Sequence, residues 1–234
     1  MNALKTLTLI TGLLAITATA KADLTHGPNP YAAGYGFDTP TEASWSIWNR
    51  GDVGTLYAEW DTFVDASFPG LRTAAPDVGQ FGTAHTHMTW NAGVFRAGSG
   101  NLYSFTVPQR YTATLTPTAP LAGPVRAALQ FETWGIEMNY ASLLLNGLAP
   151  TFSAPTYTEG SYQTSFGPVT LVQYLAYWDL PGAATSYQFS FNSPAHQSLA
   201  QVAIDIGPVP LPGAIWMFGA GLSGLLAFNR RRRA

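Results

Sequence analysis

The chain has 234 residues, a formal net charge of −2 and no cysteine. The lack of cysteine excludes a disulfide framework, so a folded domain must be stabilised by packing. Residues 23–207 hold five arginines, no lysine and all thirteen acidic residues, which gives this part a formal net charge of −8. A surface of that charge repels nucleic acid and anionic lipid, so we exclude nucleic-acid binding.

The N-terminal 22 residues have the pattern of a secretory signal peptide. Lys5 supplies the positive start, Leu7 to Ile16 form a short apolar stretch, and Ala20-Lys21-Ala22 gives a cleavage pattern of small residues. We therefore divide the chain into a signal peptide (1–22), an ectodomain of about 185 residues (23–207) and a C-terminal segment (208–234). The ectodomain is long enough for one domain with a sizeable core.

Apolar and polar residues alternate along much of the ectodomain, which predicts strands. In Val125–Thr133, for example, the apolar residues alternate with Arg126, Gln130 and Glu132, which indicates a strand with one face in water. Strands are predicted at Ser44–Trp48, Leu56–Asp61, Ala84–Trp90, Leu102–Val107, Tyr111–Thr116, Val125–Thr133, Ser142–Leu145, Val169–Trp178, Ser186–Phe191 and Gln201–Ile206. No internal window has a helical period, so we expect an all-β fold of two packed antiparallel sheets, a jelly-roll-like sandwich.

Several segments between the strands are predicted as turns, loops or arms. Asn146-Gly147 is typical of a type I′ hairpin, because both positions tolerate positive φ. Asp23–Thr41, rich in Gly, Pro and aromatic residues, is expected to lie along the sandwich as an extended arm. Val64–Gly82 is expected to be a long loop, and loops of that length usually cover or form a site. Arg50-Gly51-Asp52 spells an adhesion tripeptide, but we interpret it first as a turn.

Aromatic side chains beside polar groups suggest a glycan platform. Trp134 follows Glu132 on the polar side of its predicted strand, and Tyr174 and Trp178 share one side of theirs. Sugar rings stack on exposed aromatic rings flanked by amide and carboxylate groups. The competing interpretation is that these aromatic residues serve the core.

Two further patterns are weighed as catalytic or metal sites. Glu59, Asp61 and Asp65 have the spacing E-x-D-x-x-x-D, which would suit a glycosidase carboxylate pair or a Ca²⁺ site. Here an acidic solvent face over a strand anchored by Trp60 is the favoured interpretation. His85 and His87 project to one side of a predicted strand but lack a third ligand nearby, so we expect no metal there. Without a complete catalytic constellation, we expect no enzyme and no cofactor.

The C-terminal segment combines a proline motif, an apolar stretch and a basic end. Its motif is Val209-Pro210-Leu211-Pro212, Gly213 to Phe228 carry no charge, and the last element is Arg230-Arg231-Arg232-Arg233. Sixteen helical residues reach about 24 Å, which nearly spans the hydrocarbon layer of a membrane. The arginines belong on the cytoplasmic side, which puts the ectodomain on the opposite side.

This tail resembles the PEP-CTERM sorting signal of exported proteins in Gram-negative bacteria that make extracellular polysaccharide. Leu211 stands where the family has its glutamate. The resemblance covers about the last 26 residues and implies processing by a membrane-embedded transpeptidase of the exosortase type. A plain membrane anchor is the alternative, with the same topology.

These observations lead to one leading expectation and two alternatives. The leading one is a non-enzymatic surface protein, first anchored in the inner membrane with its ectodomain in the periplasm and later on the cell surface or in the matrix. Its role would be structural or adhesive, in association with extracellular polysaccharide of a biofilm or floc. The alternatives are a carbohydrate-binding module and a jelly-roll glycoside hydrolase.

Overall fold

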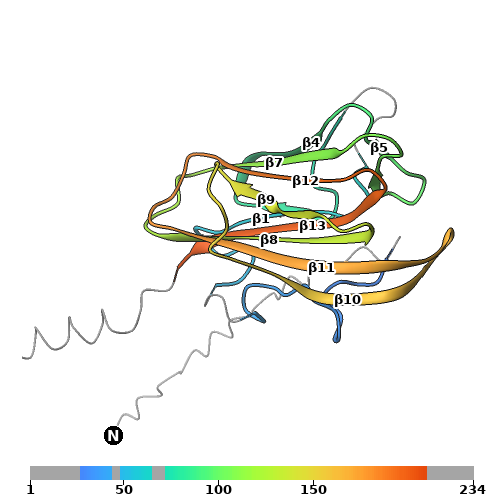
Figure 1. The fold of residues 1–234 in the computed structure, drawn as a ribbon. Coiled ribbons are helices and arrows are strands. Elements are labelled where there is room, and N and C mark those ends of the chain that lie inside the picture. Colours follow the sequence, from blue (N-terminus) through green and yellow to red (C-terminus); the bar gives the residue numbers. More distant parts are fainter. Residues whose placement is uncertain (1–26, 44–47, 65–71, 210–234) are drawn as a thin grey trace, which may run out of the picture.

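The computed structural model describes residues 27–43, 48–64 and 72–209, and this part of the chain is an all-β sandwich of two antiparallel sheets. Figure 1 shows the sheets stacked, with the long β10–β11 hairpin at one edge. The predicted all-β class and the two-sheet arrangement are confirmed. The sorting motif Pro210-Leu211-Pro212, the apolar stretch and the four arginines lie outside the described residues, as do residues 1–26. Within the described ranges, no helix has the length and apolar character that crossing a membrane requires.

The first sheet has eight strands in the described part of the chain. Its main order is β10-β11-β8-β13-β1-β3, and β6 pairs with both β13 and β5. Its strands are β1 (Leu56–Trp60), β3 (Gly79–Phe81), β5 (Phe95–Arg96), β6 (Leu102–Tyr103), β8 (Val125–Gly135), β10 (Phe152–Thr164), β11 (Gly167–Leu180) and β13 (Gln197–Pro208).

The second sheet has five strands among the described residues, in the order β2-β4-β7-β12-β9. These are β2 (Thr73–Ala74), β4 (Thr83–Trp90), β7 (Gln109–Pro117), β9 (Asn139–Leu145) and β12 (Tyr187–Ser193). The chain passes repeatedly between the two sheets after β7, so strands far apart in sequence become neighbours.

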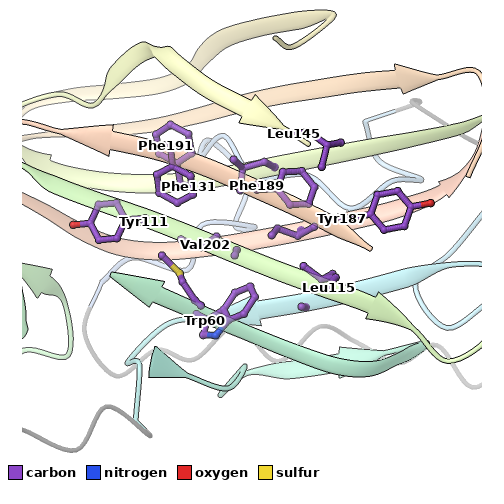
Figure 2. Close-up of a cluster of buried hydrophobic side chains, with 14 of the residues drawn as sticks. Trp60, Tyr111, Leu115, Phe131, Leu145, Tyr187, Phe189, Phe191 and Val202 are labelled. Carbon is purple, nitrogen blue, oxygen red and sulfur yellow. The ribbon is translucent and has the colours of Figure 1, made fainter. Parts of the chain in front are cut away.

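The core lies between the sheets and is rich in aromatic side chains (Figure 2). Phe131 of β8 stacks on Phe191 of β12, with ring centroids 5.8 Å apart and planes 8° apart. Trp60 of β1 is fully buried and donates from its indole nitrogen to the Ala74 carbonyl at 3.1 Å. Burial of such large side chains is the main favourable term in a domain without disulfides.

The Gly- and Pro-rich arm, residues 27–43, lies on the outer face of the eight-stranded sheet. Its Gly36 N–H donates to the side chain of Gln173 on β11, and its Asp38 N–H donates to the side chain of Gln130 on β8 at 2.8 Å. Only glycine fits at position 36, because a Cβ there would lie 2.8 Å from the Thr156 carbonyl carbon. The predicted position along the sandwich is thus confirmed for the described residues, but the arm is not extended: its backbone turns repeatedly, with hydrogen bonds such as that from the Phe37 N–H to the Pro30 carbonyl at 3.0 Å.

The arm corrects the prediction that β8 has one face in water. Gln130 and Glu132 point to the outer face, as the alternation predicts, but both are buried. Polar groups covered in this way need hydrogen-bond partners, and the arm and the neighbouring strands supply them. The outer face is therefore a second, polar layer of packing.

Most predicted strands are present, with boundaries shifted by a few residues. The Asn146-Gly147 turn is confirmed, because both residues have positive φ and Leu145 and Leu148 exchange two backbone hydrogen bonds of 2.9 Å. The predicted loop Val64–Gly82 is partly wrong, since its described residues include β2 and β3. The thirteen-residue strand β10 was not predicted. The strand predicted at Ser44–Trp48 lies outside the described residues except for Trp48.

Candidate functional site

The candidate site lies on the outer face of the eight-stranded sheet, near the end of β8. Strand pairing puts Trp134 of β8 opposite Leu171 of β11, and Glu132 opposite Gln173. Paired residues in an antiparallel sheet point to the same face, so these four side chains share the outer face. The alternation of β8 alone therefore determines which of its side chains can reach this surface.

Glu132 holds the polar centre of the site. Its two carboxylate oxygens accept hydrogen bonds of 2.6 Å, one from the Trp134 indole nitrogen and one from the Gln173 amide. The carboxylate is fully buried, and the arm begins directly above it, since a Cβ at Gly27 would lie 3.4 Å from the Trp134 ring. The hydrogen bond from Gln173 holds the buried carboxylate in place, and the hydrogen bond from the indole nitrogen to that carboxylate fixes the orientation of the Trp134 ring.

Three tyrosines surround this centre. Tyr162 of β10 packs against Trp134 with ring centroids 5.2 Å apart, and Tyr157 of β10 packs against Tyr35 of the arm at 5.0 Å. The Tyr157 hydroxyl donates to Glu159 at 3.2 Å. We call the group the aromatic–carboxylate cluster; it comprises Tyr35, Glu132, Trp134, Tyr157, Glu159 and Tyr162.

Two tyrosines of the cluster, Tyr157 and Tyr162, have a raised pKa and keep their hydroxyl protons. Burial raises the pKa of Tyr162, and the Glu132 carboxylate raises it further. All three tyrosine rings are partly exposed, while the Glu132 carboxylate beneath them is closed off. The surface thus offers aromatic faces and hydroxyl groups, a combination that suits contacts with sugar rings.

Of the four residues predicted as a glycan platform, the structure brings only two together. Trp134 and Glu132 belong to the cluster, but Tyr174 and Trp178 lie on the inner face of β11 and are buried in the core. Tyr174 pairs with Phe131 and Trp178 with Ala127, both inward-facing residues of β8. Tyr174 and Trp178 do share one face, as predicted, but it is the opposite face from Trp134.

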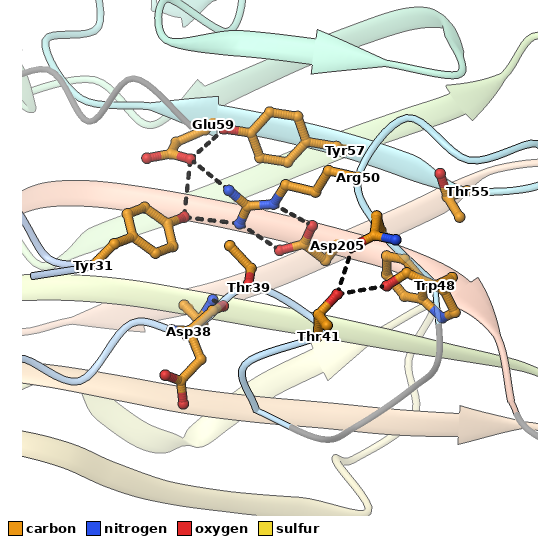
Figure 3. A network of polar contacts seen from close by, with 12 residues as sticks. Tyr31, Asp38, Thr39, Thr41, Trp48, Arg50, Thr55, Tyr57, Glu59 and Asp205 are labelled. Atoms are coloured by element: carbon orange, nitrogen blue, oxygen red, sulfur yellow. Dashed lines mark hydrogen bonds and ion pairs between the residues drawn. The ribbon is translucent and has the colours of Figure 1, made fainter. Parts of the chain in front are cut away.

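A second polar network lies on the same outer face, closer to β1 (Figure 3). Arg50 donates through Nε and Nη2 to both carboxylate oxygens of Asp205, each at 2.7 Å, and its guanidinium lies 4.1 Å from the Tyr57 ring centre. Arg50 also donates to the Tyr31 hydroxyl at 2.8 Å and approaches Glu59 at 3.5 Å. One cation therefore serves two buried carboxyl groups.

Burial and the shared cation set the protonation of this network. Burial raises the pKa of Glu59 to about 7, against the lowering effects of Arg50 and of hydrogen bonds donated by Tyr57 and Tyr31. Burial alone would lower the pKa of Arg50, but the charge and hydrogen bonds of Asp205, together with Tyr31 and Tyr57, outweigh it and the pKa is raised, so Arg50 stays charged. Glu59 is therefore the group of this network that titrates near neutral pH.

These contacts correct the predicted acidic solvent face of β1. Glu59 and Asp61 share the outer face, as predicted, but they are only 2% and 1% exposed. The Asp61 carboxylate accepts a hydrogen bond from the Gln201 amide at 2.9 Å. The backbone N–H of Asp61 donates to the Asp77 carboxylate at 2.7 Å. In this arrangement a polysaccharide substrate reaches neither carboxyl group. Asp65, the third acid of the motif, lies outside the described residues.

The remaining sequence patterns are placed as follows. His85 and His87 lie on one side of β4 with ring centroids 4.6 Å apart, and burial followed by the neighbouring His85 lowers the pKa of His87. Among the described residues, no group of three or more His, Asp or Glu side chains is arranged to hold a metal ion.

Arg50-Gly51-Asp52 forms the predicted turn, with the Asp52 N–H donating to the Asn49 carbonyl at 3.1 Å. The guanidinium group of Arg50 is hydrogen-bonded to Asp205.

Sequence reasoning missed Tyr35, Tyr157, Glu159 and Tyr162. Three of them lie on β10, which the sequence did not mark as a strand, and Tyr35 lies on the arm. The one available signal was the density of tyrosine in Tyr157–Tyr162 beside Glu159.

Compared with known proteins, this chain matches no family model, no curated protein and no solved structure.

Proposed function

We propose that this chain is an exported surface protein of a Gram-negative bacterium, with a structural or adhesive role in extracellular polysaccharide. The N-terminal signal pattern and the C-terminal proline motif, apolar stretch and arginine run support export and anchoring. The precursor would be held in the inner membrane with its ectodomain in the periplasm. An exosortase-type transpeptidase would then process the tail on the way to the cell surface or matrix.

We further propose that the sandwich is of the jelly-roll type. The support is its connectivity, since β8, β11 and β13 lie in one sheet while β7, β9 and β12 lie in the other. Such crossings between sheets are typical of Greek-key sandwiches.

The aromatic–carboxylate cluster carries the proposal that the ectodomain binds sugar. It places partly exposed aromatic rings from three separate segments around a fixed carboxylate and amide. Rings held by a network of this kind bind a flat ligand with little loss of side-chain entropy. The same observation favours the carbohydrate-binding alternative, which becomes the molecular activity behind the matrix role.

Truncating the cluster is expected to weaken binding to polysaccharide. Tyr162→Ala removes the ring that packs on Trp134, and we expect about a three- to tenfold loss of affinity, the worth of one aromatic contact. The measurement is the migration of the purified ectodomain in native gels containing the extracellular polysaccharide of the producing cells.

Phe152→Ala provides a matched control for this experiment. Phe152 is a partly exposed aromatic residue on the same strand and the same outer face, at the opposite end, where it packs on Tyr177. Its removal should leave migration unchanged. Unretarded migration of the unaltered ectodomain would refute the sugar-binding proposal.

Deleting Gly213 to Arg233 is expected to release the protein from the envelope into the culture medium, because the deletion removes both the apolar stretch and its cationic stop. Immunoblots of envelope and medium fractions, with a periplasmic marker to exclude lysis, measure the change. Continued retention in the envelope would contradict the proposed anchor.

A further inference from the structure

Two histidine side chains form a pair on the outer face of the five-stranded sheet. His85 and His87 alternate with the core residue Met88 along β4, so both imidazoles lie on the face away from the core. Strand β7 lies beside β4 (Figure 1), and its Thr116 and Thr114 are the partners of the two histidines on that face. His85 is exposed and His87 is partly exposed, so an ion can reach the pair from solvent. We call it the β4 histidine pair.

One ring nitrogen of the pair has no protein partner. Nδ1 of His87 is closed off from solvent and makes no hydrogen bond within the described part of the chain. A covered nitrogen of this kind has lost its hydrogen bond to water, and a bound water or ion typically fills the position beside it. Imidazole nitrogens are ligands that suit Cu, Zn and Ni ions. The second imidazole of the pair therefore favours an ion over a water at this position.

The separation of the two rings matches adjacent coordination positions around one ion. An ion bound about 2.0 Å from a ring nitrogen lies roughly 3.2 Å from the centre of that ring. Two rings bound at a right angle then have centres roughly 4.5 Å apart, whereas a tetrahedral angle requires roughly 5.2 Å. The ring centroids of His85 and His87 are 4.6 Å apart, which agrees with the right angle.

A right angle between two nitrogen ligands points to one class of metal ion. Zn²⁺ sites that stabilise a fold are tetrahedral and are closed by four protein ligands, which a pair of histidines does not supply. Cu²⁺ prefers a square-planar or tetragonal arrangement of nitrogen and oxygen ligands, and it stands highest in the affinity order of the divalent first-row ions. The pair therefore suits an exchangeable Cu²⁺ ion with water at the open positions.

We propose that His85 and His87 form a Cu²⁺ site on the outer face of the five-stranded sheet. The two imidazoles bind the ion at adjacent positions, and oxygen ligands from solvent occupy the others. This changes the expectation from the sequence, which counted the ligands nearby but gave neither the ring separation nor the covered nitrogen. The site does not depend on the proposed sugar binding, because the aromatic–carboxylate cluster lies on the other sheet.

The test isolates the pair from the other histidines of the chain. The chain has four histidines, and His26→Gln with His196→Asn leaves His85 and His87 as its only imidazoles. Asparagine is chosen at position 196 because it tolerates the φ of 67° found there. Calorimetric titration of this variant of the full chain, with CuCl₂ as the only probe, should show one Cu²⁺ bound per chain.

Removing either imidazole of the pair is expected to weaken Cu²⁺ binding by at least about tenfold, because one of two nitrogen ligands is lost. His85→Gln is the decisive variant, since His85 is exposed and its replacement should keep the melting temperature unchanged. His87→Gln should cause a loss of similar size. Electron paramagnetic resonance gives an independent readout, with two imidazole nitrogens on Cu²⁺ in the intact pair and one after either replacement.

Two results would overturn the proposal. If no Cu²⁺ binds, or if His85→Gln binds it as tightly as the intact pair does, the site is refuted and a water is the partner of the covered nitrogen. Tighter binding of Zn²⁺ than of Cu²⁺ would overturn the choice of ion. Neither result bears on the binding of polysaccharide, which Tyr162→Ala tests on the other sheet.

Discussion

Replacing Arg50 by methionine is expected to lower the free energy of unfolding by about 3–5 kcal/mol, the usual cost of removing one partner of a buried ion pair. The substitution keeps much of the side-chain volume but leaves Asp205 and Glu59 facing each other without a cation. Asp205 is 1% exposed, so water cannot replace the lost hydrogen bonds without opening the arm. Urea unfolding followed by tryptophan fluorescence measures the change.

Arg126→Met supplies a control with almost the same local geometry. Arg126 donates through Nε and Nη2 to both oxygens of Asp179 at 2.7 Å and lies 4.1 Å from the Tyr177 ring centre, as Arg50 does with Asp205 and Tyr57. This pair is far more exposed, and removing it should cost no more than about 1 kcal/mol. Equal losses for the two arginine variants would contradict the importance we give to burial.

Asp205→Asn in the Arg50→Met background identifies the cause of the loss. If an unpaired buried carboxylate is what destabilises the single variant, the double variant should be more stable than the sum of the two single effects. Strict additivity would instead mean that Arg50 acts through its packing on Tyr57.

The alternation of apolar and polar residues predicted the strands in which one face is apolar and buried in the core. It failed for β10, which has partly or fully exposed residues on both faces. Pro155 and Gly160 interrupt its sequence, and two register shifts interrupt its pairing with β11, so no period of two persists along it. A strand at the edge of a sheet that extends past the core has little reason to show a hydrophobic pattern.

For β1 and β8, the sequence predicted which side chains point outward but not what covers that outer face. Glu132 and Glu59 alternate with core residues, so their outward direction was predictable. Their burial depends on the arm, which contacts the sheet through single residues such as Gly36 and Tyr31. Such contacts join positions up to 137 residues apart and leave no local pattern.

The same reasoning explains the error at Tyr174 and Trp178. Their spacing of four residues correctly put both on one face of β11, but their side relative to Trp134 depends on the pairing of β11 with β8. A shift of one residue in that register would reverse the answer. Register is set by the whole sheet, so it could not be predicted from either strand alone.

Glu59 should make the protein less stable as the pH rises through neutrality. Its pKa is raised from 4.5 to about 7 in the folded protein, so between these values the folded state binds more protons than the unfolded state. The stability contributed by protonation is complete below pH 4.5 and is lost as the pH passes 7. With these pKa values, the loss between about pH 5 and pH 8 amounts to about 2.5 kcal/mol.

Glu59→Gln should remove this part of the pH dependence, because a glutamine has the shape of the protonated acid and does not titrate. The groups that face Glu59 are Tyr31 of the arm, Arg50 of the turn, and Tyr57 and Asp205 of the sheet. Arg50 stays charged and burial raises the pKa of both tyrosines, so none of these three changes charge in this range. Urea unfolding at about pH 5 and pH 8 should show a larger drop for the unaltered protein than for the variant, by about 2.5 kcal/mol. A drop of equal size in both proteins would mean that Glu59 is already ionised at acidic pH, with Arg50 shared evenly between Glu59 and Asp205.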